Sequence, residues 1–453
     1  SPRTNCGTVQ LGDSGDTITI PAGASITNSG TASGFGRTGT VDWQTTIKTG
    51  DFTASSGEGY FVNTTSGEVD VTLPAGSAGS IVSVADYANT ADTNNIILKQ
   101  NGSDKIEGST DDFIINQEGA AGTLVFADST KGWIFTDTGN SSDVFGETFI
   151  QATGGNSVVE CGNCKIHTFT GPGTFCVSAV SGSAANNLVS YMVIAGGGGG
   201  SVQGGGGGAG GYREVKSPTT PYTASPLDGY SSSPNRVTVT ATAFPITVGA
   251  GGGGACFPSP RMGVKGSNSI FSTITSAGGG GGKGYSLPAP QAAPGFMNGG
   301  SGGGGSAGGG SSNPAGTGNT PPTTPSQGNN GGTSNGDFGD FNGAGGGGAG
   351  GAGTNSPGTG GGTAGGGGAT TSINGTPTAR AGGGGGGGWN SSSPGPASAG
   401  GGAGGSPGSN AGGAGTANTG GGGGSSMSPN VNNYTAKGGN GGSGIVIIRY
   451  KFQ

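Results

Sequence analysis

The sequence predicts an all-β protein that carries a glycine-rich domain of packed polyglycine II helices, inserted between strands of a β-sheet, with essentially no α-helix. Three observations predict this fold. Glycine supplies 114 of the 453 residues. Short runs of β-branched and aromatic residues recur at the spacing that is typical of a sandwich or barrel. No stretch repeats its apolar residues at helical spacing over a useful length.

Residues 1–40 predict short strand-turn units that form a shaft-like β-repeat segment. Their large apolar residues before Phe35 are only Val9, Leu11, Ile18, Ile20 and Ile26. Such a set makes a poor core for a lone unit, whereas three copies stacked around a common axis would share it.

Residues 41–142 predict a small all-β domain. Strand-like runs alternate with Gly, Asn, Asp or Pro at nearly every junction. The seven candidate strands are 60–62, 69–73, 81–84, 95–98, 112–115, 123–126 and 132–135.

Residues 143–195 predict a β platform for the glycine-rich body. Residues 165–170 and 174–177 flank Gly171-Pro172-Gly173, a turn signal, and together predict a hairpin. The strand 191–195 joins this hairpin, and residues 236–240 and 245–248 add further strands.

The glycine-rich body, residues 196–444, is framed by two apolar strands. Residues 191–195 enter the first glycine run directly, and the last glycine run feeds residues 445–450 of the closing strand, 445–453. Because both strands are continuous apolar runs, we expect them to be buried on both faces and to lie as neighbours in one sheet.

An ordinary side-chain core is excluded for most of this body. Residues 277–436 contain only eleven large apolar side chains. Burial of so few groups at about 25 cal/mol per Å² cannot offset an ordering cost of about 1–2 kcal/mol per residue. The backbone must therefore make the packing, and glycine chains in the extended helix with three residues per turn can do so by hydrogen bonding to their neighbours.

Charge and composition exclude several functions. The net charge of −6 argues against nucleic acid as a partner, and no run of 18 apolar residues is present to insert into a membrane. The chain begins at Ser1 without an initiator Met, so we expect sequence upstream. No motif predicts a cofactor; the run 204–211 follows a strand, but no Lys-Ser/Thr pair follows it.

The cysteines allow two interpretations. Cys161, Cys164, His167 and Cys176 have residue types that bind zinc. The predicted hairpin instead favours an intrachain disulfide between Cys164 and Cys176, or buried thiols. The total of five cysteines leaves at least one free or paired between chains.

Enzymatic chemistry is not predicted. His167 is the single histidine, which weakens any triad mechanism. Asp111 and Asp112 diverge on a strand, and Asp337 and Asp340 lie in a glycine-rich loop rather than in a rigid acid/base pair.

Isolated aromatic and acidic residues of the glycine-rich body are the candidate recognition residues. Lacking a core to enter, each aromatic ring either caps the bundle, packs on another chain or faces a ligand such as a carbohydrate. The candidates are Tyr285, Phe296, Asp337, Phe338, Asp340, Phe341, Trp389 and Tyr434.

The framing strands and glycine runs resemble the Gly-rich C-terminal domain of tailed-bacteriophage tail fibres and adhesins. The residues concerned are 191–200, 204–214, 246–251 and 441–450. The segment 41–139 resembles small β modules of marine-phage fibres. The resemblance implies a homotrimer in the virion tail, contacts with other virion proteins, and a tip whose loops attach to a host surface glycan or outer-membrane protein.

Other functions stay open at this point. The chain is alternatively a structural subunit of a filament, virion decoration or extracellular coat. A third class comprises a fibre-borne polysaccharide depolymerase or an ice-binding protein. A cleft with catalytically spaced carboxylates would favour the enzyme, and both ends buried against copies of the chain would favour the filament.

Overall fold

A computed structural model describes residues 17, 19, 41–138, 149–257, 261–284, 294–306, 314–335, 342–357, 360–388, 393–405, 410–427 and 436–452. The predicted shaft, residues 1–40, lies outside these ranges apart from Thr17 and Thr19. The chain divides into two compact units, Ser1–Phe145 and Gly146–Gln453, which are described separately below.

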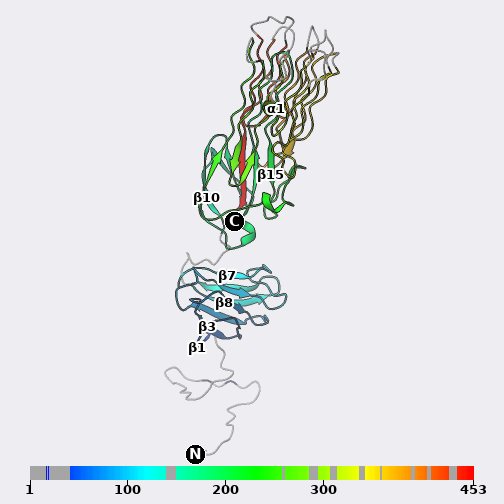
Figure 1. The fold of residues 1–453 in the computed structure, drawn as a ribbon. Helices are drawn as coiled ribbons and strands as arrows, with labels where there is room; N and C mark the ends of the chain where they lie inside the picture. Colours follow the sequence, from blue (N-terminus) through cyan, green and yellow to red (C-terminus); the bar gives the residue numbers. More distant parts are fainter. Residues whose placement is uncertain are drawn as a thin grey trace, which may run out of the picture. The chain divides into compact units, whose positions relative to one another are not determined.

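The first unit contains two β-sheets that face each other across one core (Figure 1). One sheet has the order β1-β3-β5-β8-β9 and the other β2-β4-β6-β7. All seven predicted strands are confirmed, and β1 and β2 are additional. The strands are β1 (Asp42–Lys48), β2 (Phe52–Thr53), β3 (Glu58–Val62), β4 (Val69–Thr72), β5 (Ile81–Asp86), β6 (Ile96–Lys99), β7 (Phe113–Ile115), β8 (Ala121–Asp128) and β9 (Gly132–Thr138).

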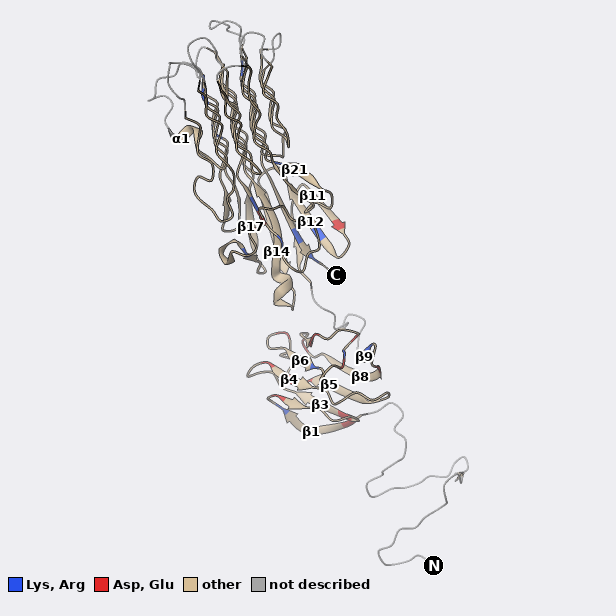
Figure 2. Ribbon diagram, turned by 90° about the vertical axis from the view of Figure 1, so that its right-hand side faces the viewer, with Lys and Arg blue, Asp and Glu red and all other residues tan. Residues whose placement is uncertain are grey.

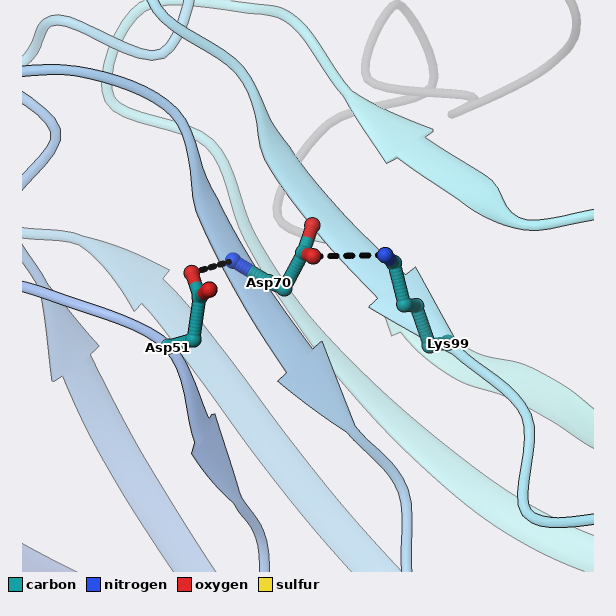
Figure 3. Close-up of polar contacts among 3 residues, drawn as sticks. All are labelled: Asp51, Asp70 and Lys99. Carbon is teal, nitrogen blue, oxygen red and sulfur yellow. Dashed lines mark hydrogen bonds and ion pairs between the residues drawn. The ribbon is translucent and has the colours of Figure 1, made fainter.

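Consecutive strands β1 to β6 alternate between the two sheets, and the pairs formed among these six strands are parallel. The pairs that include β7, β8 or β9 are antiparallel. Alternating buried positions, such as Val69 and Val71 on β4, supply the shared core. The edge of the smaller sheet is tied by polar contacts (Figure 3). The Asp51 carboxylate accepts a hydrogen bond from the Asp70 N–H at 2.9 Å, and the Asp70 carboxylate pairs with Lys99 on β6.

The second unit begins with two further sheets, of order β10-β13-β17-β18-β19 and β11-β12-β22-β14-β15. A buried cluster of side chains from both sheets lies between them, which makes this part a β-sandwich. Its strands are β10 (Gln151–Thr153), β11 (Ser157–Cys161), β12 (Cys164–Phe169), β13 (Gly173–Ala179), β14 (Leu188–Ile194), β15 (Tyr212–Val215), β16 (Val237–Thr238), β17 (Ala243–Thr247), β18 (Ser269–Phe271), β19 (Ile274–Ser276) and β22 (Ile445–Lys451).

The prediction for the two framing strands is confirmed. β14 and β22 pair antiparallel from Ser190↔Arg449 to Ile194↔Ile445. Val193 and Val446 face the sandwich core, whereas Ile194 and Ile445 belong to a second cluster on the opposite face of the same sheet. The glycine-rich body therefore lies between two neighbouring strands that are covered on both faces.

The predicted hairpin of residues 165–170 and 174–177 is wrong. β12 pairs with β11 and β22, while β13 pairs with β10 and β17 in the other sheet. Phe169 and Phe175 nevertheless share the core between the sheets. The Gly171-Pro172-Gly173 turn thus carries the chain across the sandwich, which local turn chemistry alone does not distinguish from a hairpin.

The glycine-rich body consists of long segments that run side by side with little regular strand or helix (Figures 1 and 2). The described helices are α1 (Pro294–Met297) and two short 3-10 turns, η1 (Ala184–Asn187) and η2 (Ser233–Asn235). One hairpin, β20 (Ala369–Thr371) with β21 (Thr378–Arg380), covers the outer face of the framing-strand sheet. Within the described residues, the fold is therefore mostly β-sheet with almost no α-helix, and no helix is long and apolar enough to cross a membrane.

Hydrogen bonds of the segment 196–202 repeat every third residue. The N–H groups of Gly196, Gly199 and Val202 all donate to carbonyls of the segment 261–267. The N–H groups of the remaining residues of this segment donate to carbonyls of two more segments. The carbonyls of residues 196–201 accept N–H groups from three other segments. These five neighbours are 205–208, 439–442, 252–255, 279–282 and 423–426. The segment 196–202 is thus hydrogen bonded through its backbone to neighbours on all sides.

The close approach of these segments requires glycine. A Cβ on Gly207 would lie 2.1 Å from the Gly198 carbonyl oxygen, and one on Gly384 would lie 2.1 Å from that of Gly423. Both distances are far below any normal carbon–oxygen contact, and backbone atoms on both sides leave nothing flexible to move. The missing side chains are what allow neighbouring backbones to meet.

Candidate functional site

The end of the bundle that lies away from the sandwich is the candidate site (Figure 2). The segment 196–202 reverses there into 204–211 through Gln203, whose φ of 53° is left-handed. Val202 donates its N–H to the Arg261 carbonyl, and Gly205 donates to that of Lys283. The Ser306 hydroxyl donates to the Gln203 carbonyl. We call the residues around this reversal, 201–205, the distal end.

Serine hydroxyls and a few apolar groups fix the distal end. The Ser201 hydroxyl donates to the Gly205 carbonyl at 2.8 Å and lies 3.1 Å from the Ser425 hydroxyl, which accepts the Gly204 N–H. Val202 packs with Ala255 and Ala436. Because these groups are buried and hydrogen bonded, the backbone of the reversal is held in a defined conformation.

Among the described residues, Arg261 and Lys283 lie at this end, where their backbone carbonyls accept the N–H groups of Val202 and Gly205. The Arg261 guanidinium stacks 4.8 Å from the centre of the Phe257 ring. Lys283 is buried, and burial lowers the pKa of its ammonium from the ordinary value.

Seven of the eight predicted recognition residues lie outside the described residues: Tyr285, Asp337, Phe338, Asp340, Phe341, Trp389 and Tyr434. For each of the four intervals that contain them, one described residue at or next to its boundary lies at the distal end. A Cβ on Gly284 would meet the Arg261 carbonyl, and one on Gly343 would meet that of Gly204. Gly387 donates its N–H to the Gly204 carbonyl, and Ala436 packs on Val202.

Phe296 is the predicted residue that the structure describes. It lies on α1 with 56% of its surface exposed, next to the buried Met297. The carbonyls of both residues accept N–H groups of the bundle, from Gly281 and Gly303 respectively. The short helix is therefore anchored by Met297 and by its backbone, while the Phe296 ring is open to a partner.

The disulfide considered for Cys164 and Cys176 is not formed, because both thiols are free. Cys164 is buried on β12, and Cys176 is exposed on β13 in the other sheet, so the two side chains do not meet. The zinc hypothesis also lacks support, since no group of three His, Cys, Asp or Glu side chains fit to hold a metal occurs among the described residues. His167 hydrogen bonds instead to the Gly154 carbonyl and the Tyr450 hydroxyl.

A buried carboxylate that the sequence interpretation missed joins the sandwich to the glycine-rich body. Glu214 on β15 accepts hydrogen bonds from the Tyr212 and Thr371 hydroxyls and from the Ser225 N–H. Burial raises the pKa of the Tyr212 hydroxyl well above its ordinary value. The available signal was a charged residue inside an otherwise apolar strand, which in a buried sheet must be paired or hydrogen bonded.

The comparison with protein families assigns the second unit. A model described as a glycine-rich domain matches residues 168–451. No curated protein matches the chain. The match runs from the last two residues of β12 to the end of β22 and includes the whole bundle between them. The chain therefore belongs to the glycine-rich domain family.

Proposed function

We propose that this chain is a tail-fibre or adhesin protein of a tailed bacteriophage that attaches to the host cell surface without catalysing a reaction. In this proposal the glycine-rich body is the tip of a homotrimeric fibre in the virion tail. Its partners are copies of itself, other virion proteins and a host surface glycan or outer-membrane protein. The resemblance of the framing strands and glycine runs to phage fibres motivates the assignment.

The observation that carries the proposal is that several segments of the bundle are held together at one end, around the reversal at residues 201–205. Phe257, Gly284, Ser306, Gly343 and Ala436, which come from five separate segments, are held at or beside the distal end by backbone contacts or packing. Segments anchored at one end of a firm scaffold can vary in sequence without disturbing it, as recognition loops do in other proteins.

The scaffold in this proposal is a bundle of polyglycine II helices. A helix with three residues per turn places every third N–H on the same side. The segment 382–387 repeats in this way: residues 382 and 385 donate to 399 and 402, residues 383 and 386 to 366 and 363, and residues 384 and 387 to 207 and 204. Three donor directions in a repeat of three residues are the expected signature of this helix.

The test replaces the aromatic residues that the proposal assigns to recognition. A Phe338→Ala, Phe341→Ala, Trp389→Ala variant should lose at least about tenfold in binding to susceptible cells, because such aromatic contacts carry most of a recognition energy. Fluorescently labelled protein is incubated with a panel of bacterial strains and scored by flow cytometry. Light scattering on the same samples measures whether the trimer persists.

The matched control is Tyr87→Ala, which removes an aromatic ring that is 54% exposed in the first unit. This variant should bind like the unchanged protein. Normal binding by the triple variant would refute the assignment of these aromatics. Equal loss in both variants would indicate non-specific adhesion.

A structural filament subunit is the second candidate, and one observation favours it. β11 is the outer strand of its sheet, and Val158 and Val159 are 48% and 51% exposed. Exposed apolar edge strands tend to pair with other chains. Concentration-dependent filaments without binding to any strain in the panel would select this function over attachment.

A further inference from the structure

Cys161 and Cys164 face each other across the end of a hairpin. Cys161 ends β11, Cys164 begins β12, and their Cα atoms are direct partners in the antiparallel register. Only Gly162 and Asn163 separate them, and Gly162 takes the φ of 57° that such a tight turn demands. Both thiols are free.

The two thiols also lie on the same face of the sheet. Directly opposed residues of an antiparallel pair project to one side. Cys164 shares its side of β12 with Ile166 two residues on, and both Ile166 and Cys161 pack into the cluster under the β20–β21 hairpin. The Cys161 sulfur lies 3.6 Å from the position of a Cβ on Gly375, in the turn of that hairpin.

Backbone geometry at this pair suits a disulfide bond. Opposed residues in an antiparallel ladder have Cα atoms about 4.5 or 5.5 Å apart, and disulfides span about 4.4–6.8 Å. A metal ion fits this pair less well than a disulfide bond does. His167, the histidine considered as a further ligand, projects from the opposite face of β12 to Cys164 and hydrogen bonds within the sandwich core. We propose that Cys161 and Cys164 form a cross-strand disulfide when the protein meets a small-molecule disulfide such as oxidised glutathione.

The difference in exposure between the thiols sets the order of the reaction. Cys161 is partly exposed and Cys164 is buried. The Cys161 thiolate attacks the small disulfide, forms a mixed disulfide and releases one thiolate of the reagent. The Cys164 thiolate then attacks the Cys161 sulfur and releases the second. Two cysteine thiols lose two protons and two electrons, and one molecule of the reagent is reduced to two thiols.

The consequence of the bond is local. The ring encloses only the two residues of the turn, and short loops gain the least from cross-linking. The bond would instead hold the outer strand β11 to β12 and keep the Cys161 side chain against the β20–β21 turn. It thus fastens the exposed edge strand at the end where the ladder begins.

Peptide mapping of the full chain tests this proposal. The protein is incubated with oxidised glutathione at pH 8, blocked with iodoacetamide and digested with trypsin, which places both cysteines in the peptide 132–165. This peptide should lose two hydrogen atoms and carry neither glutathione nor the blocking group. If the oxidised protein is reduced before it is blocked, the same peptide should carry two alkylated cysteines.

The exposed Cys176 and Cys256 are internal controls, and each should retain a glutathione adduct. A Cys164→Ser variant should keep a glutathione adduct on Cys161 as well. This result would show that glutathione reaches Cys161 and that Cys164 removes it in the unchanged protein. The proposal is overturned if the unchanged protein keeps glutathione on Cys161, or if both thiols stay free to react with iodoacetamide after denaturation.

Discussion

The first unit and the glycine bundle are packed in opposite ways, the first through its side chains and the second through its backbone. The first unit buries a cluster of 17 hydrophobic residues between two sheets, including Leu98 and Trp133. The segment 196–211 of the bundle buries no large side chain except those of Val202 and Gln203, and it is held by backbone hydrogen bonds to its neighbours. In one region side chains exclude water, and in the other their absence lets backbones touch.

This contrast explains where each region tolerates change. In a side-chain core, a change in volume of one methylene group already affects stability, but other hydrophobic residues of similar volume can replace the original ones. In the bundle the smallest addition, a Cβ, meets a carbonyl oxygen at about 2 Å at most buried positions. At these positions no residue larger than glycine fits without moving the backbone, whereas Ala209 and Ala344 mark buried positions of the bundle that accommodate a methyl group.

The largest effect is expected for Gly384→Ala in the middle of the bundle. Its Cβ would lie 2.1 Å from the Gly423 carbonyl oxygen, and the Gly384 N–H donates to the Gly207 carbonyl at 2.9 Å. Separating these segments breaks several backbone hydrogen bonds at once. We expect a loss of more than about 4 kcal/mol in the free energy of unfolding, measured by chemical denaturation.

Gly367→Ala is the matched control within the same bundle. Gly367 is exposed, has no atom within 4 Å of a Cβ, and does not have a positive φ. Its replacement should change stability by no more than about 0.5 kcal/mol. Similar effects of the two substitutions would show that glycine acts through chain flexibility rather than through close approach.

The next effect belongs to the first unit. Leu98→Ala removes a fully buried side chain of β6 and should cost about 2–5 kcal/mol, because the rigid surroundings leave a cavity. Differential scanning calorimetry should show a lower Tm for one transition only. A shift of every transition by the same amount would mean that the two kinds of packing unfold together.

Periodicity predicted the side-chain-packed parts of the molecule well. Seven of the nine described strands of the first unit follow β-branched runs between turn residues, and the pairing of β14 with β22 follows from their apolar faces. Within the glycine-rich body, the scarcity of large side chains predicted backbone packing but not which segments meet. Glycine runs are alike, so nothing in their composition specifies one neighbour over another.

The predictions that failed depended on long-range partners. The turn at Gly171-Pro172-Gly173 is compatible with a hairpin, and only the competing partners of β12 and β13 exclude it. The role of Glu214 was missed rather than wrongly predicted, because its partner Thr371 lies 157 residues further along the chain. Of the predicted recognition residues, the structure describes Phe296 alone, so the others stay predictions.

A smaller effect is expected from pH. His167 is the single histidine and is fully buried in the sandwich, and desolvation lowers the pKa of its ring. The unfolded chain therefore takes up a proton at a higher pH than the folded one. Stability of the second unit should fall as the pH drops below about 6.5, the ordinary pKa of histidine.

The measurement is the Tm of the second unit between pH 8 and pH 5, with His167→Gln as the comparison. The substitution should lower the Tm at pH 8 and flatten the dependence over this range, since the titrating ring is gone. An unchanged slope in the variant would assign the pH dependence to carboxylates instead.

Hydrogen exchange of the glycine amides tests most directly the claim that backbone hydrogen bonds hold the bundle. The N–H groups of residues 205–210 donate to carbonyls of neighbouring segments at 2.8–3.0 Å, although no strand or helix is assigned there. Exchange followed by NMR should find that these amides exchange at least about 10³ times more slowly than those of an unstructured chain. Their exchange should be as slow as that of the β14 amides. Exchange of residues 205–210 at unstructured rates, with β14 still protected, would contradict the account.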